Sequence, residues 1–213
     1  QKRWDRLFEV LNRVLRHNLR NDMGVISGHG ALLADRDQGD PTELGKTIKR
    51  MSDDLVELSE KARKLEQTAR REAEPTRVDP DTLLTSLIES YREDHPDVTF
   101  DLSVQTDRDI YAGREIGDAV SELIENAVKH NTATEPHVTI SVRDEEESLL
   151  LTVEDTGLGI DEMEANVVSK GEETALEHGS GLGLWLVNWI VTRYGGSFQI
   201  EGSHDDGTRA FVR

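Results

Sequence analysis

The chain has 213 residues, with 43 acidic and 25 basic side chains, a net charge of −18 and no cysteine. The absence of cysteine excludes disulfide scaffolds, cysteine-ligated zinc and thiol nucleophiles. The negative charge argues against nucleic acid and against anionic membrane surfaces, because both partners are themselves polyanionic. No apolar stretch approaches the roughly 20 residues of a membrane span. We therefore expect these residues to be cytoplasmic, without membrane contact. Because the first residue is Gln1, we also expect a fragment whose upstream sensor or membrane segments have been removed.

The basic residues comprise 18 arginines and only 7 lysines. An acid-rich, lysine-poor composition is typical of salt-accumulating microbes such as halophilic archaea, because high salt screens the repulsion between surface charges. An ordinary acidic cytosolic protein is the alternative.

Residues 1–74 show no strand-like alternation and predict a helical hairpin. Apolar residues recur at three- and four-residue steps over Leu7–Leu33. A second helix is expected after Asp40, which can cap it, with Pro41 at the first helical position. Its apolar seam over Leu44–Leu65 follows heptads. Two helices cannot cover both apolar stripes, so we expect a homodimer that forms a four-helix bundle. A monomeric hairpin packed on the rest of the chain is the alternative.

A linker is predicted over residues 75–80, because Pro75 disfavours helical geometry before it, and a second domain over residues 81–213. Apolar spacing predicts its elements. They are a helix from Asp79, a strand over 98–104, a helix over 116–128, strands over 138–142 and 149–153, a helix over 182–194, and a hairpin of 198–201 with 209–212. This mixture predicts an α+β layered domain with helices on one face of a mixed sheet.

Two glycine-rich segments and one polar helix face are the candidate binding sites for phosphate and Mg²⁺. Asp155-Thr156-Gly157-Leu158-Gly159 follows a predicted strand, and a loop from Gly179 opens a predicted helix, whose free N–H groups suit phosphate. Neither loop has a dinucleotide-binding or P-loop pattern. Glu122 and Asn126 share a helix face near Lys129, and oxygen ligands of this kind suit Mg²⁺. A solvated polar face is the alternative for that helix.

The order and spacing of these segments resemble the N, G1 and G2 boxes of the GHKL-type (Bergerat) ATP-binding domain of histidine kinases, over residues 76–213. The resemblance implies that Asn126 and Glu122 hold Mg²⁺ and that Asp155 accepts the adenine amino group. A carboxylate accepts and cannot donate, which favours adenine over guanine. The further nucleotide-binding residues that it implies are Lys129, His130, Gly157, Gly159, Ile160, Gly181, Leu182, Gly183 and Thr208.

The segment 160–178 would then be the lid over the nucleotide. The aromatic F box of the family is not recognisable there, and Lys170 is a weak candidate for a phosphate contact.

His17 is the candidate phosphoryl acceptor. It lies about 130° from the centre of the apolar stripe of its helix, which indicates exposure to solvent. His17 and Asn21 resemble the H box of the dimerisation and phosphotransfer domain of sensor histidine kinases. The sequence departs from the common box at Asn18, where an acid is usual, and at Asp22, where proline is usual, and it is similar to an archaeal HNLRN variant. The resemblance implies that Asn21 aligns water for dephosphorylation of a partner.

The resemblance implies an ATP-dependent autokinase of two-component signal transduction. His17 would become phosphorylated and pass the phosphoryl group to an aspartate of a response regulator receiver domain. An unperturbed imidazole is mostly neutral at pH 7, so Asn18 need not act as a base. Two alternatives stay open: a GHKL ATPase or serine kinase, and a dimeric nucleotide-binding scaffold that transfers no phosphate.

Overall fold

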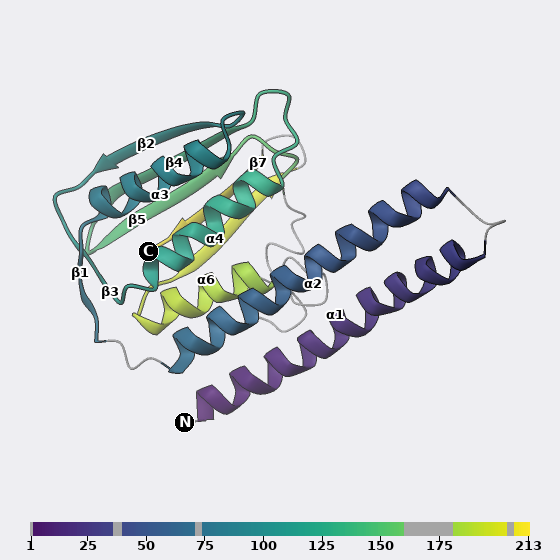
Figure 1. Ribbon diagram of the computed structural model, residues 1–213. Helices are drawn as coiled ribbons and strands as arrows, with labels where there is room; N and C mark the ends of the chain where they lie inside the picture. Colours follow the sequence, from purple (N-terminus) through teal and green to yellow (C-terminus); the bar gives the residue numbers. More distant parts are fainter. Residues whose placement is uncertain (1, 36–39, 71–73, 160–180, 204–206) are drawn as a thin grey trace. The chain divides into compact units, whose positions relative to one another are not determined.

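The computed structural model describes residues 2–35, 40–70, 74–159, 181–203 and 207–213 (Figure 1). The chain forms two compact units, one built around Gln1–Arg71 and the other around Glu72–Ala175 and Gly183–Arg213.

The first unit is the predicted helical hairpin. Helix α1 (Lys2–Ala34) and helix α2 (Pro41–Arg70) pack along one another as an antiparallel pair (Figure 1). The expected start of α2 is confirmed, since Asp40 Oδ1 accepts a hydrogen bond from the Thr42 backbone N–H at 2.8 Å and so satisfies a donor that the helix leaves unpaired. Within the described part of the chain, no helix is long and apolar enough to cross a membrane.

The second unit contains a five-stranded mixed sheet. Its strands are β2 (Thr99–Gln105), β4 (His137–Glu145), β5 (Ser148–Asp155), β6 (Phe198–Ser203) and β7 (Gly207–Val212). Their order across the sheet is β2-β4-β5-β7-β6, with β2 parallel to β4 and every other pair antiparallel. The predicted strands and the mixed sheet are confirmed. A parallel pair requires a crossover, and α4 lies in the connection between β2 and β4.

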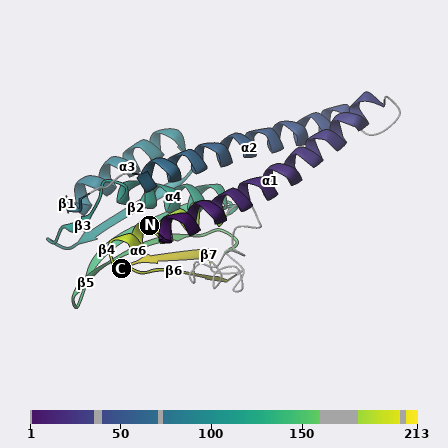
Figure 2. The same ribbon diagram turned by 90° about the horizontal axis from the view of Figure 1, so that it is seen from below.

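Three helices cover one face of this sheet: α3 (Pro80–Asp94), α4 (Ile116–Lys129) and α6 (Gly181–Arg193) (Figures 1 and 2). Alternate residues of β4 point into the core, because successive side chains of a strand face opposite sides. The largest fully buried side chains of this core belong to Leu84, Ile88, Ile124, Ile140, Leu186 and Ile190. One-sided coverage leaves the other face of the sheet half-exposed.

A second, two-stranded sheet was not predicted. Strand β1 (Thr76–Val78) pairs antiparallel with β3 (Ile110–Ala112), with Arg77 opposite Tyr111. Strands of three residues show too little alternation to be recognised in a sequence. The segment expected as a linker over residues 75–80 therefore contains a paired strand.

A buried ion pair and hydrogen bond join the start of α4 to the end of α6. Glu115 is only 6% exposed. The Tyr194 hydroxyl donates a hydrogen bond to Glu115 Oε1, and Arg193 Nη1 lies 3.4 Å from the same oxygen. Burial, followed by the hydrogen bond and the charge of Glu115, raises the pKa of Tyr194 to about 12.

We predict that Tyr194→Phe lowers the free energy of unfolding by about 1–2 kcal/mol at pH 8, because the buried Glu115 carboxylate loses a donor. The folded-state pKa of Tyr194 is raised, so its contribution is fully present below pH 10 and is lost as the pH rises through about 12. The free energies of unfolding of the wild type and of Tyr194→Phe, measured in urea, should therefore converge as the pH rises. Tyr111→Phe, which alters a tyrosine that is 66% exposed, serves as the control. A difference that persists unchanged above pH 12 would contradict this assignment.

Candidate nucleotide-binding site

Asp155, the last residue of β5, is held in place by backbone donors. Its Oδ1 atom accepts hydrogen bonds from the Gly157 N–H at 2.8 Å and from the Thr208 N–H at 3.4 Å. Thr208 reaches it because β7 pairs with β5, with Arg209 opposite Glu154. Strand pairing thus brings two predicted site residues that are far apart in the sequence to one carboxylate.

The Asp155 carboxylate lies in a poorly solvated position. Asp155 is 8% exposed, and this burial raises the pKa of its carboxyl group. Hydrogen bonds from Gly157 and Thr208 act in the opposite direction and favour the charged form. An ionised carboxylate in such a site can only accept hydrogen bonds, so it selects a ligand that presents an N–H or O–H group.

The turn after Asp155 requires glycine at position 157. A Cβ atom there would lie 2.8 Å from Asp155 Oδ1 and 2.9 Å from the carbonyl oxygen of His130. Gly159, with φ of 78°, has the left-handed conformation that glycine adopts without strain. The loop therefore passes close to the end of α4, where His130 caps the helix.

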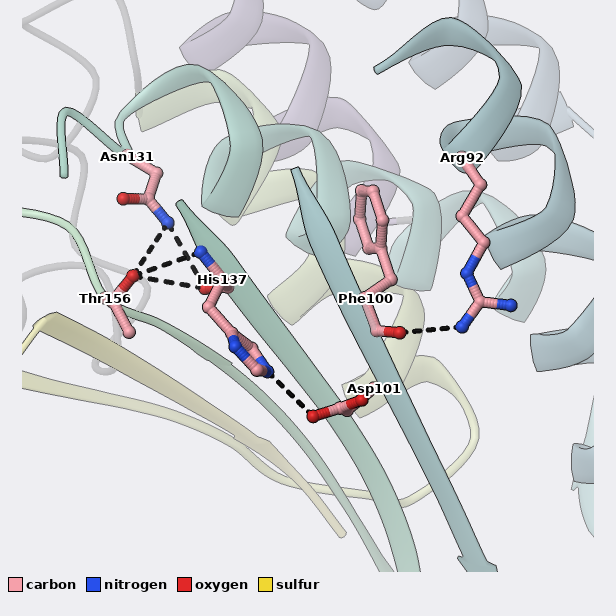
Figure 3. A network of polar contacts seen from close by, with 6 residues as sticks. All are labelled: Arg92, Phe100, Asp101, Asn131, His137 and Thr156. Carbon is pink, nitrogen blue, oxygen red and sulfur yellow. Dashed lines mark hydrogen bonds and ion pairs between the residues drawn. The ribbon is translucent and has the colours of Figure 1, made fainter. Parts of the chain in front are cut away.

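A polar network that the sequence did not predict supports this turn (Figure 3). Asn131 Nδ2 donates to the His137 carbonyl at 3.2 Å and to Thr156 Oγ1 at 3.3 Å. The His137 N–H donates to Thr156 Oγ1 at 3.1 Å, and the Thr156 N–H donates to the His137 carbonyl at 3.2 Å. The segment after α4, the start of β4 and the end of β5 are thereby joined beside Asp155.

The outer part of the network is more exposed. His137 Nε2 lies 2.9 Å from Asp101 Oδ2 on the neighbouring strand β2, and the two side chains are 35% and 66% exposed (Figure 3). A pair of this kind adds little stability because water screens it. Only the inner part of the network, on Asn131 and Thr156, touches the turn.

Glu122 and Asn126 lie together on α4, as their spacing predicts. Glu122 is 3% exposed, and a Cβ atom at Gly183 would lie 2.6 Å from Glu122 Oε2 and 3.7 Å from Asn126 Nδ2. Glycine at position 183 therefore leaves the space that these polar atoms occupy. Asn126 Nδ2 is buried and has no hydrogen-bond partner among the described residues.

These features fit a bound Mg²⁺–nucleotide. A buried amide without a partner is costly unless a ligand satisfies it, and amide and carboxylate oxygens suit Mg²⁺. The amide orientation is interchangeable, so Asn126 can present either oxygen or nitrogen.

The remaining predicted residues fall into four groups. Lys129 and His130 are exposed at the end of α4, and Gly181 and Leu182 lie in the first turn of α6. Ile160, Lys170 and the expected lid over 160–178 lie outside the described residues. His17, Asn18 and Asn21 lie in α1 of the first unit; the side chains of His17 and Asn18 are also outside the described part, and Asn21 is exposed.

Residues 112–213 match the family described as histidine kinase-, DNA gyrase B- and HSP90-like ATPase. The sensor protein SrrB of Staphylococcus aureus is 22% identical over 211 residues, which cover 92% of this chain and 36% of that protein. The chain thus spans about a third of the length of the curated relatives that it matches.

Solved structures show the same fold. The ATP-binding domain of PrrB from Mycobacterium tuberculosis is 28% identical, with a TM-score of 0.54, and the match covers 65% of this chain and 95% of that one. The histidine kinase ThkA, in a complex with the response regulator protein TrrA, is 20% identical with a TM-score of 0.74, and the match covers 99% of this chain and 62% of that one. The predicted fold class, a helical hairpin followed by a GHKL-type α+β domain, is confirmed.

We predict that Asp155→Asn weakens binding of ATP about tenfold or more. The amide keeps an oxygen for the Gly157 and Thr208 N–H groups and turns an NH₂ group towards the ligand, where two donors would meet. Since burial raises the pKa of Asp155 in the folded state, the loss of stability that its charge causes begins as the pH rises above the unfolded-state pKa and is complete above the raised folded-state pKa. The variant should therefore be as stable as the wild type, or more stable, at pH 8. Calorimetric titration and thermal unfolding measure both effects, and wild-type ATP affinity in the variant would refute the assignment.

We predict that Asn131→Ala weakens ADP binding by about 1–2 kcal/mol, because the turn that carries Asp155 and Gly157 loses its tie to the end of α4. Asp101→Asn is the matched control, since it alters only the exposed part of the same network. Calorimetry should give a wild-type Kd for the control. Weaker ADP binding by Asp101→Asn, together with wild-type ADP binding by Asn131→Ala, would contradict the role given to Asn131.

Proposed function

We propose, from the membership of residues 112–213 in the histidine kinase-, DNA gyrase B- and HSP90-like ATPase family, that this chain is the catalytic core of a sensor histidine kinase. In this account it uses ATP to phosphorylate its own His17 and passes the phosphoryl group to an aspartate of a response regulator receiver domain. The resemblance to this kind of ATP-binding domain was predicted from the sequence and is confirmed over residues 112–213.

One observation carries the proposal: a buried acceptor, Asp155, and a buried polar pair, Glu122 and Asn126, lie in one ATPase domain. Asp155 would accept the adenine amino group, with Gly157 and Gly159 shaping the pocket and Thr208 closing it. Glu122 and Asn126 would hold Mg²⁺, which when bound neutralises charge on the transferred phosphoryl group. Backbone N–H groups of Gly181, Leu182 and Gly183 at the start of α6 would meet the phosphates, with Lys129, His130 and Ile160 nearby.

In the proposed reaction a neutral ring nitrogen of His17 attacks the γ-phosphorus of ATP. A nitrogen–phosphorus bond forms as the bond to the bridging oxygen breaks, and ADP leaves. Positioning and charge neutralisation supply most of the catalysis in phosphoryl transfer. Asn18 would orient the imidazole, and Asn21, one turn on in α1 and exposed, would align water for removal of phosphate from the partner.

We propose domain bounds of 1–74 for the hairpin, 75–80 for the linker and 81–213 for the ATP-binding domain. We also propose a homodimer through the hairpin. Several large apolar side chains of α1 and α2 are exposed: Leu19, Met23, Val25, Leu32 and Val56. A second copy would cover such a surface by completing a four-helix bundle.

The receiver-domain partner is supported by the likeness to ThkA, which was solved with the response regulator protein TrrA. Use of ATP supports a cytoplasmic location for these residues. The net charge of −18 supports a high-salt interior such as that of a halophilic archaeon, where ions screen the repulsion.

We predict that incubation with γ-labelled ATP and Mg²⁺ in molar KCl labels the protein, and that the label is lost in acid and kept in alkali, as a phosphoramidate requires. His17→Gln should abolish the label while the Kd for ATP stays unchanged. His29→Gln, on the same helix, is the matched control and should keep the label.

Label that persists in His17→Gln would refute the acceptor. Acid-stable label would indicate a serine kinase instead. ATP binding without any label would favour the scaffold, which Asn18 and the absence of an aromatic between residues 160 and 178 also favour.

A further inference from the structure

A cavity of about 330 Å³ lies in the ATPase unit at the end of the sheet remote from Asp155. Leu149, near the start of β5, lines it, whereas Asp155 is the last residue of that strand. The cavity is also lined by Ile116, the first residue of α4, and by Val191, near the end of α6. Asn126 and Gly183 lie towards the opposite ends of these two helices, so the cavity and the candidate nucleotide site are separate and share both helices.

The walls of the cavity are mainly apolar. Strands β4, β5 and β7 contribute Val142, Leu149, Leu151 and Val212. The aromatic ring of Tyr111 on β3 also lines it and is 66% exposed. Apolar surface and an exposed aromatic ring together favour a ligand that removes both from water.

The two arginines at the rim, Arg108 and Arg213, already have partners within the unit. Arg108 donates to the carbonyl oxygens of Glu147 at 3.0 Å and Ser148 at 3.3 Å, and Arg213 Nε donates to Glu145 Oε2 at 2.7 Å. The Tyr194 hydroxyl donates to Glu115. An anionic ligand would give up its hydration here without gaining an uncommitted positive charge from Arg108 or Arg213, which favours an uncharged ligand over an anion.

The size of the cavity restricts the ligand further. Ligand sites usually measure about 300–1,000 Å³, so this cavity of about 330 Å³ lies at the small end of that range and suits a small molecule.

We propose that this cavity is a binding site for an uncharged, largely apolar small molecule with the dimensions of a two-ring aromatic compound. The site is distinct from the nucleotide site, and the proposal does not depend on kinase activity. Its occupancy would add contacts to β3, whose partner β1 follows α2 in the chain, and to both helices that carry the candidate nucleotide residues.

The test uses 2-naphthol as the probe, because it is uncharged at pH 7 and has about the required size. Titration of the full chain, followed by probe fluorescence with saturating ADP present, should give saturable one-site binding. Naphthalene-2-sulfonate, which has the same rings and a negative charge, should bind about tenfold more weakly or worse.

Variants locate the site. Leu149→Trp places an indole ring in the cavity and should weaken 2-naphthol binding about tenfold or more. Ile110→Trp, in a different strand, is a second variant with the same expected effect. Glu201→Trp adds the same ring at an exposed position on β6 outside the cavity and should bind like the wild type; circular dichroism confirms folding of each variant.

Absence of saturable binding, equal binding by folded cavity variants, or equal affinity for the sulfonate would overturn the proposal. Displacement of 2-naphthol by ADP would overturn it as well, because the probe would then occupy the nucleotide site.

Discussion

The candidate site depends on one constraint, the burial of the Asp155 carboxylate at the end of a central strand. β5 is hydrogen-bonded on both sides, by β4 and β7, so its last residue cannot move towards water without breaking the sheet. The Gly157 and Thr208 N–H groups hold one carboxylate oxygen. The glycine at position 157 and the Asn131–Thr156 network support the turn that follows this acceptor.

Fixing a charge in this way costs stability. Burial raises the pKa of Asp155, so the folded protein is less stable with the carboxylate charged than it would be with a neutral isostere. Asn126 also lowers the stability of the folded protein, because its buried amide nitrogen has no hydrogen-bond partner within the described residues. A bound nucleotide with its metal ion would offset both costs. A chain folded for stability alone would avoid them, and their presence in one domain is the physical signature of a ligand site.

Much of the fold could be predicted because its elements carry strong local signals. The alternation of Val138, Ile140 and Val142 and the helical spacing around Glu122 and Asn126 identified β4 and α4. The β1–β3 ribbon was missed because three-residue strands carry almost no periodicity. The contacts of Asn131, Thr156 and His137 were missed because they join residues up to 25 positions apart. The antiparallel register of β5 with β4, which sets Asp155 opposite Val138, brings Thr156 beside His137, and register cannot be read from one sequence.

Asp155 is the residue that we propose selects a nucleotide by its exocyclic amino group. The most direct test is a calorimetric comparison of ATP with inosine triphosphate, which differs at that group by carrying an oxygen. The account predicts that ATP binds about tenfold more tightly or better, because the oxygen would face a carboxylate that cannot donate. Equal affinity for the two nucleotides would contradict it.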